Sequence, residues 1–141
     1  MSLRDDLIRE EGLRLKPYKD TLGVLTIGVG RNLEHVGITE AEAMALLDND
    51  IARVYADLDR ELSWWRGRPD EVKDALANAT FQLGINGIMG FKRMLAALHA
   101  GDYETAATEA IDSKWYQQTP TRVERFAKVL RDAGKLPTQT V

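Results

Sequence analysis

Hydrophobic residues recur at helical spacing through most of the chain, and the longest such run lies in its first half. Apolar side chains at positions 43, 47, 51, 54, 58 and 62 keep to one helical face for about twenty residues. Thr39 and Glu42 have capping-box spacing just before this run, in which each side chain accepts a hydrogen bond from the other's backbone N–H. A helix over about 39–62 is therefore predicted, long enough to connect two lobes.

Shorter helices are predicted on both sides of this one. An apolar stripe predicts a helix over residues 3–11, which Gly12 ends. Another begins near Pro69, where a first helical turn tolerates proline, and ends at Gly84, after which a glycine-rich link continues to residue 90. Further apolar stripes predict helices at about 91–98, 102–113 and 120–134.

A strand pattern lies between the first helix and the long one. The stretch Val24–Ile27 contains β-branched residues and stands between a turn at 21–23 and the glycines 28 and 30. We therefore expect Tyr18 to Val29 to form a small antiparallel element. The order of elements predicts an α+β fold in one domain, residues 1–141, with two lobes. These are a hairpin lobe at about 12–38 and a mostly helical lobe at about 60–141 that also includes helix 3–11.

Composition limits the chemistry available to this chain. Its 141 residues include no cysteine and two histidines, so disulfides, thiolate zinc sites and a cysteine nucleophile are excluded, and no metal or other cofactor is expected. A net charge of −3 argues against a nucleic-acid partner bound through overall charge. Residues 113–135 differ, with six basic and two acidic side chains, which indicates either a solvated helix face or a local site for an anionic polymer.

No targeting segment is recognisable in the sequence. Charged residues interrupt the N-terminus before an apolar run of signal-peptide length can form, and eighteen apolar residues never run together. We therefore expect a chain that does not insert into a membrane and stays in the compartment where it is made.

Two acidic residues flank the predicted change from helix to hairpin. Glu11 and Asp20 lie nine positions apart, a spacing that can place their carboxylates on opposite sides of a groove. Because most acidic residues of a soluble domain are surface residues, this spacing alone does not establish a catalytic pair.

Glu11 and Asp20 belong to the first of three sequence blocks that occur in a fixed order along the chain. The first runs Glu-Gly-Leu-Arg-Leu from residue 11, through Tyr18 and Asp20, to Thr-Ile-Gly-x-Gly at 26–30. The second is Asn-Ala-Thr-Phe-Gln-Leu-Gly at 78–84 with Gly-Phe at 90–91, and the third is Lys-Trp-Tyr-Gln-Gln-Thr-Pro-Thr-Arg at 114–122. Together they resemble the T-even-type phage lysozymes of glycoside hydrolase family 24, over nearly the whole chain.

The resemblance implies a lysozyme-like fold and muramidase activity. The reaction would be hydrolysis of the β-1,4 bond between N-acetylmuramic acid and N-acetylglucosamine in peptidoglycan. By the same resemblance, Glu11 is the general acid, Asp20 is the general base or electrostatic stabiliser, and Thr26 helps to hold the attacking water. A hydroxyl that positions water suits a single displacement better than a covalent intermediate, so we expect inversion at the anomeric carbon.

Further residues acquire expected roles in the same way. The resemblance places Arg122 beside the catalytic glutamate as an orienting residue, and it places Gln82 and Phe81 along the sugar cleft. Trp115 is expected to pack in the core, because its neighbours are helical and apolar.

The surroundings expected for the two carboxyl groups agree with their roles. A general acid must keep its proton until it donates it to the leaving oxygen. Glu11, at the C-terminal end of a helix, faces the negative end of the helix dipole, which disfavours its charged form, and burial against the hairpin would act in the same direction. Asp20, in a turn open to water, should remain ionised. A cation at Arg122 would oppose the first effect.

The chain departs from the family pattern at three places. Arg31 stands where the family usually has histidine, so we expect changed local pairing with catalysis retained. The segment between Gly30 and Gly37 is about twenty residues shorter than in the T-even enzyme, which leaves less wall on that side of the cleft. Leu22 replaces an acidic residue at the cleft edge, so substrate range or turnover could differ.

The expected function is that of a phage or prophage endolysin. It would stay in the host cytoplasm until a holin releases it to the cell wall, and it would act on glycan strands as a monomer. Three alternatives remain at this point: a non-catalytic wall-binding domain, a lytic transglycosylase that leaves anhydro ends, and a virion tail component. The first would be expected to lack one of Glu11, Asp20 or Thr26, and all three are present.

Overall fold

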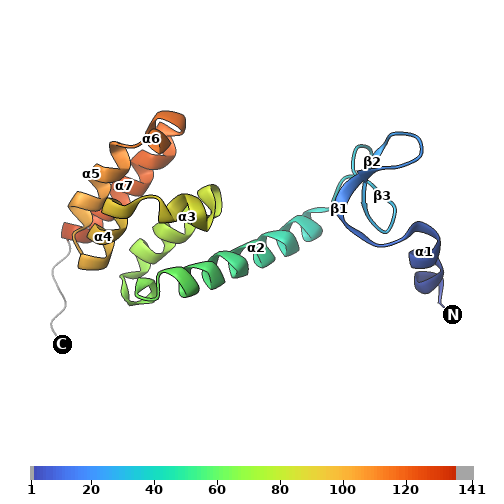
Figure 1. The fold of residues 1–141 in the computed structure, drawn as a ribbon, viewed down its shortest axis with the longest axis horizontal. Helices are drawn as coiled ribbons and strands as arrows, with labels where there is room; N and C mark the ends of the chain where they lie inside the picture. The colour runs from blue at the N-terminus through green and yellow to red at the C-terminus, as the bar shows by residue number, and fades with distance from the viewer. Residues whose placement is uncertain (1, 136–141) are drawn as a thin grey trace. The chain divides into compact units, whose positions relative to one another are not determined.

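The computed structural model describes residues 2–135 and divides into two compact units, Met1–Leu47 and Asp48–Val141. The first unit contains a short helix, a three-stranded antiparallel sheet and the start of a long helix, whereas the second is built from helices (Figure 1). The predicted α+β, lysozyme-like class is therefore confirmed. The expected association of helix 3–11 with the helical lobe stays a prediction.

The first unit begins with helix α1 (Leu3–Glu11). The Ser2 side chain caps its start by accepting a hydrogen bond from the Asp5 N–H at 3.1 Å. At the other end, Gly12 has φ 77° and donates its N–H to the Ile8 carbonyl at 2.8 Å. This backbone conformation suits glycine, so the helix ends where the sequence predicted and Glu11 becomes its last residue.

The sheet follows directly, with strands β1 (Arg14–Lys19), β2 (Leu25–Gly28) and β3 (Arg31–Asn32). They are antiparallel in the order β1-β2-β3, so β2 is central. The predicted hairpin is confirmed. Two features were not predicted: β1 begins well before Tyr18, with an irregular register between Arg14 and Tyr18, and a short third strand is added after a tight turn.

Helix α2 (Glu40–Glu61) is the predicted long helix, and its bounds lie within one residue of the expected ones at each end. Its capping box is formed as expected: the Thr39 N–H donates to Glu42 Oε1 at 2.9 Å, and the Glu42 N–H donates to Thr39 Oγ1 at 3.1 Å. The first eight residues of α2 belong to the first unit and the remainder to the second.

The second unit contains a short 3₁₀ helix η1 (Trp65–Gly67) and helices α3 (Asp70–Met89), α4 (Lys92–Ala100), α5 (Tyr103–Ile111), α6 (Lys114–Gln118) and α7 (Pro120–Lys135). Helix α7 contacts α3, α5 and α6, and α4 packs on α5 (Figure 1). The centre of the core consists of side chains at most 1% exposed, among them Leu58, Val72, Leu76, Ile88, Met94, Leu98, Val123 and Leu130.

Three details of this unit differ from expectation. Gly84 does interrupt a helix, with φ 75° and ψ 160°, but the chain resumes helical structure to Met89, so the link predicted at 84–90 is wrong. Burial of Ile88 in the core gives that extra turn a tertiary reason to form. Helix α6 was not predicted, and α7 continues through Gly134 to its neighbour Lys135. Within residues 2–135, no helix is long and apolar enough to span a membrane.

Candidate functional site

The Glu11 side chain lies against the turn between β2 and β3. A Cβ atom at Gly30 would lie 2.8 Å from Glu11 Oε2, 3.0 Å from its Cδ and 3.2 Å from its Cγ. Gly30 also has φ 65°, which side chains other than glycine rarely adopt. The backbone conformation therefore favours glycine at position 30, and a side chain there would displace the carboxyl group of Glu11.

Asp20 is fixed by the turn that connects β1 and β2. Its Oδ1 accepts hydrogen bonds from the backbone N–H groups of Leu22 at 2.8 Å and Val24 at 2.9 Å. The backbone of Asp20 closes the same turn by donating to the Val24 carbonyl at 2.9 Å. Among the described residues, no partner is recorded for Oδ2, which leaves this oxygen available to a water or a ligand.

Thr26, on the central strand, is 4% exposed, and its hydroxyl donates to the Val24 carbonyl at 2.8 Å. Because this bond uses the hydroxyl proton, Oγ1 can only accept any further hydrogen bond, through its lone pairs. A water that donates one proton to Oγ1 keeps its own lone pair free. The peptide groups of Val24 thus hold both Asp20 and Thr26.

The solvent exposure of the two carboxylates differs from expectation. The sheet of the first unit does not bury Glu11, whose side chain is exposed, and Asp20 is half-buried in its turn. The expected contrast between a buried Glu11 and an open Asp20 is therefore wrong within this unit. The contact of Glu11 with Gly30 and the backbone bonds to Asp20 distinguish the two groups instead.

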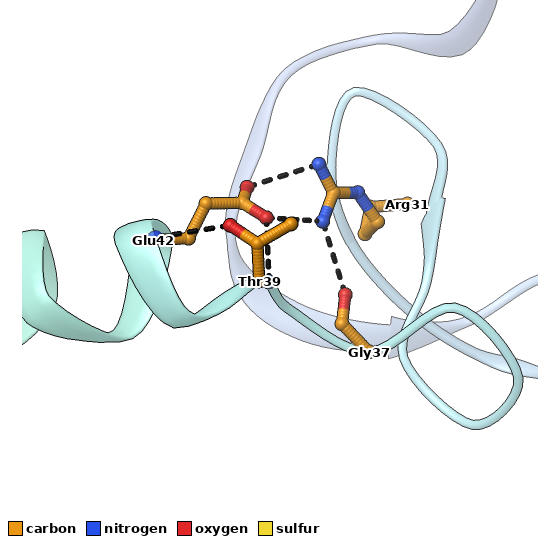
Figure 2. Close-up of polar contacts among 4 residues, drawn as sticks. All are labelled: Arg31, Gly37, Thr39 and Glu42. Atoms are coloured by element: carbon orange, nitrogen blue, oxygen red, sulfur yellow. Dashed lines mark hydrogen bonds and ion pairs between the residues drawn. The ribbon is translucent and has the colours of Figure 1, made fainter.

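Arg31 anchors β3 to the start of α2 (Figure 2). Its Nη1 donates to Glu42 Oε1 at 2.9 Å and to the Gly37 carbonyl at 3.0 Å, and its Nη2 donates to Glu42 Oε2 at 3.0 Å. These hydrogen bonds from Arg31, followed by the one from the Thr39 backbone, lower the pKa of Glu42 from 4.5 to about 2. The changed pairing expected at position 31 is therefore a bidentate ion pair that shares its carboxylate with the capping box.

The remaining predicted residues lie in the second unit. Gln82 uses both ends of its amide: Oε1 accepts from Trp115 Nε1 at 2.9 Å, and Nε2 donates to Thr119 Oγ1 at 3.4 Å. Trp115 is 3% exposed and meets Phe126 edge-on with ring centroids 5.1 Å apart, which confirms its place in the core. Phe81 is 46% exposed, and its place along the sugar cleft stays a prediction.

Arg122 is held by α3. Its Nη2 donates to the Asn78 carbonyl at 3.1 Å and to Asn78 Oδ1 at 3.0 Å, and both residues line a groove of about 680 Å³ on the second unit. The role of Arg122 as an orienting residue for Glu11 stays a prediction.

The basic segment 113–135 is partly neutralised by acidic partners. Lys128 Nζ lies 2.8 Å from Asp132 Oδ2, and Arg131 Nε lies 3.1 Å from Glu104 Oε1. Both pairs are exposed to solvent and add little to stability. In residues 2–135, no group of three or more histidine, aspartate or glutamate side chains is placed to hold a metal ion.

The sequence did not reveal two parts of this site. Nothing in the pattern linked Gly30 to Glu11, because the contact joins a helix end to a turn nineteen residues later. The capping-box signal identified Glu42, but it gave no sign that the same carboxylate also pairs with Arg31.

Known proteins similar to this chain form a consistent group. Residues 8–130 match the family described as phage lysozyme. The chain is 31% identical to the probable T4-type lysozyme 1 of Dictyostelium discoideum, over 92% of this chain and 93% of that protein. It is 40% identical to the SAR-endolysin of Escherichia phage Mu, over 73% of this chain and 60% of the endolysin.

A phage spike protein belongs to the same group. The pre-baseplate central spike protein Gp5 of Enterobacteria phage T4 is 34% identical over 92% of this chain, but the match covers only 28% of the spike protein. This chain is thus similar to one part of that spike protein and to nearly all of the probable Dictyostelium lysozyme.

Proposed function

We propose, because this chain belongs to the phage lysozyme family of peptidoglycan-hydrolysing enzymes, that Glu11, Asp20 and Thr26 cleave the β-1,4 bond between N-acetylmuramic acid and N-acetylglucosamine. The observation that best supports these roles is that the Val24 backbone holds both Asp20 and Thr26. Its N–H holds one oxygen of Asp20, and its carbonyl holds the Thr26 hydroxyl. A base and a water-binding hydroxyl are thereby fixed to one short piece of chain.

The proposed reaction is a single displacement. Glu11, protonated, gives its proton to the glycosidic oxygen as the bond from that oxygen to the anomeric carbon breaks. A water that donates to Thr26 Oγ1 attacks the anomeric carbon from the opposite face. Asp20 Oδ2 accepts the second proton of this water, so both products leave with complete hydroxyl groups. Glu11 is then ionised and Asp20 protonated, and the cycle closes when Asp20 loses its proton to solvent and Glu11 regains one.

Other residues would bind the polymer rather than react. Phe81 offers an exposed ring for stacking on a sugar. Gln82 would act mainly by fixing Trp115, because its amide already has two partners. Arg122, which α3 holds through Asn78, keeps the role that the family resemblance implies for it, as an orienting residue for the general acid.

Segment 113–135 would add a weak electrostatic attraction to the anionic wall. Because Lys128 and Arg131 already have carboxylate partners, we expect the double variant Lys128→Ala/Arg131→Ala to reduce binding to sacculi only a few-fold at low salt, and not at all at high salt. Cosedimentation with sacculi measures this. Unchanged binding at low salt would show that the segment is only a solvated helix face.

The biological setting that we propose is an endolysin that acts as a monomer and depends on a holin to reach the wall from the host cytoplasm. The similarity to a phage spike protein favours one second candidate, a wall-degrading domain carried by a virion. Antibodies against the chain would separate these settings, because only a virion component is retained on purified phage particles.

Digestion of purified Gram-negative sacculi, followed by mass spectrometry of the products, tests the proposed chemistry. The wild type should release muropeptides with reducing ends, and Glu11→Gln should release none. Glu10→Gln is the matched control, because it removes a carboxylate one position earlier on the same helix and should keep full activity. Anhydro ends would indicate a lytic transglycosylase, and no release by the wild type would indicate a wall-binding domain.

A further inference from the structure

We propose that Arg31 is a positioning residue for the reaction: by anchoring the turn between β2 and β3, it keeps Gly30 pressed against the carboxyl group of Glu11. This inference rests on the proposed role of Glu11 as general acid. Arg31 itself would touch neither the sugar nor the reacting atoms.

The anchor of Arg31 has two ends, which makes it rigid. One end is the carboxylate of Glu42, held by two parallel hydrogen bonds, and the other is the carbonyl of Gly37 (Figure 2). Glu42 is in turn fixed by the capping box, because its Oε1 also accepts from the Thr39 N–H. A shift of the guanidinium therefore breaks its bonds to a carboxylate that the first turn of α2 holds in place.

Strand β3 depends on this anchor because it is very short. It has two residues, Arg31 and Asn32, and its pairing with β2 consists of the partners Ile27 with Arg31 and Thr26 with Asn32. One further backbone bond, from the Leu33 N–H to the Leu25 carbonyl at 2.9 Å, extends it. So short a ladder gives little stability by itself, and the side-chain anchor supplies the remaining restraint.

Arg31 restrains Glu11 through Gly30. Gly30 directly precedes Arg31, and its Cα faces the carboxyl group so closely that an added Cβ would lie 2.8 Å from Oε2. If the turn moves away, the carboxyl group loses the surface that stops its rotation. Proton donation requires it to stay within hydrogen-bond reach of the glycosidic oxygen, so turnover would fall while substrate binding would not.

Steady-state kinetics on solubilised peptidoglycan test this positioning role, measured at least 20 °C below the unfolding temperature of each variant. We expect Arg31→Met to lower kcat by about 10- to 100-fold and to leave KM within about twofold. Arg31→Lys should have a kcat between those of Arg31→Met and the wild type, because an ammonium cannot donate two parallel hydrogen bonds to a carboxylate.

Arg66→Met is the matched control for stability. Arg66 also holds a carboxylate with two bonds, to Asp59 Oδ1 at 2.7 Å and Oδ2 at 3.1 Å, but it lies in the second unit. It should lower the unfolding temperature and leave kcat unchanged. If Arg31→Met behaves like Arg66→Met, with a lower unfolding temperature and a wild-type kcat, Arg31 is merely structural and the proposal is overturned.

A double-mutant cycle tests whether the effect passes through Gly30. When Gly30→Ala has already displaced the carboxyl group, adding Arg31→Met should lower kcat by less than threefold. Losses that simply multiply would mean that Arg31 acts by another route, which would contradict the proposal.

A measurement that does not depend on enzyme activity distinguishes failure of this inference from failure of the proposed function. In ¹H–¹⁵N spectra, Glu11→Gln should shift the Gly30 amide signal in the wild-type background and leave it nearly unchanged in the Arg31→Met background. An equal shift in both backgrounds would refute the positioning role. Absence of reducing ends from wild-type digests would refute the hydrolase instead, whatever the spectra show.

Discussion

The substitution Gly30→Ala tests most directly how the turn supports the proposed acid. It adds one methyl group, which would lie 2.8 Å from Glu11 Oε2, whereas ordinary van der Waals contact begins at 3.4 Å. The carboxyl group must therefore retreat by about half an ångström. The backbone of residue 30 is also strained in this variant, because alanine at φ 65° is held in the left-handed region, at a cost of about 1–2 kcal/mol.

The expected loss of activity follows from this displacement. A misplacement of about 1 Å can cost about 100-fold in rate, so half that displacement should lower kcat by roughly tenfold or more, which corresponds to about 1.4 kcal/mol in activation free energy. KM should change little, because the carboxyl group contributes to proton transfer rather than to binding of the polymer. Release of reducing ends from solubilised peptidoglycan measures both constants.

Gly28→Ala provides the matched control for the strain. Gly28 has φ 70°, nearly the same as Gly30, but an added Cβ there would find no atom within 4 Å. Both variants should lose about 1–2 kcal/mol of unfolding free energy in urea titrations, and only Gly30→Ala should lose kcat. Equal losses of kcat in the two variants would refute the reasoning, because strain alone would then explain the effect.

Three other predictions concern the ion pair, the core and the stereochemistry. Hydrogen bonds from Arg31 and then from the Thr39 backbone lower the pKa of Glu42 from 4.5 to about 2, so the pair with Arg31 stabilises the fold above about pH 4.5 and loses this contribution as the pH falls toward 2. Urea titrations should show the gap between wild type and Arg31→Met narrowing over that range, and a constant gap would contradict it. Gln82→Leu leaves Trp115 Nε1 without its partner and should cost about 1–3 kcal/mol of unfolding free energy in the same assay, a cost that Gln82→Glu should reduce. Fresh product should show the α-anomer first by NMR, and a β-anomer would indicate retention.

The sequence predicted those elements whose signals are local. The threonine and glutamate of the capping box lie three residues apart, so the start of α2 followed from neighbouring residues alone. Gly12 likewise ended α1 because its backbone conformation is a property of one residue. Gly84 was identified as a break for the same reason. That the helix resumes after it depends on the burial of Ile88, which no local pattern expresses.

The candidate site was predictable as a set of residues but not as a set of contacts. Glu11, Asp20 and Thr26 could be named because they stand in a recognisable block. The partner of Arg31 could not be named, since Glu42 lies eleven residues away across an irregular segment with no periodicity to set their distance. The exposure of Glu11 within its unit was also mispredicted, because helix-end position does not determine which surfaces cover a side chain.

The double use of the Val24 backbone has a consequence for mutational scanning. The groups that hold Asp20 and Thr26 belong to the main chain, so replacing Val24 by alanine leaves both of them in place. A survey that reads importance from side-chain replacement would therefore score position 24 as tolerant, although it supports two proposed catalytic residues. Only chemistry that alters the main chain itself, such as proline or an ester in place of the amide, would expose its contribution.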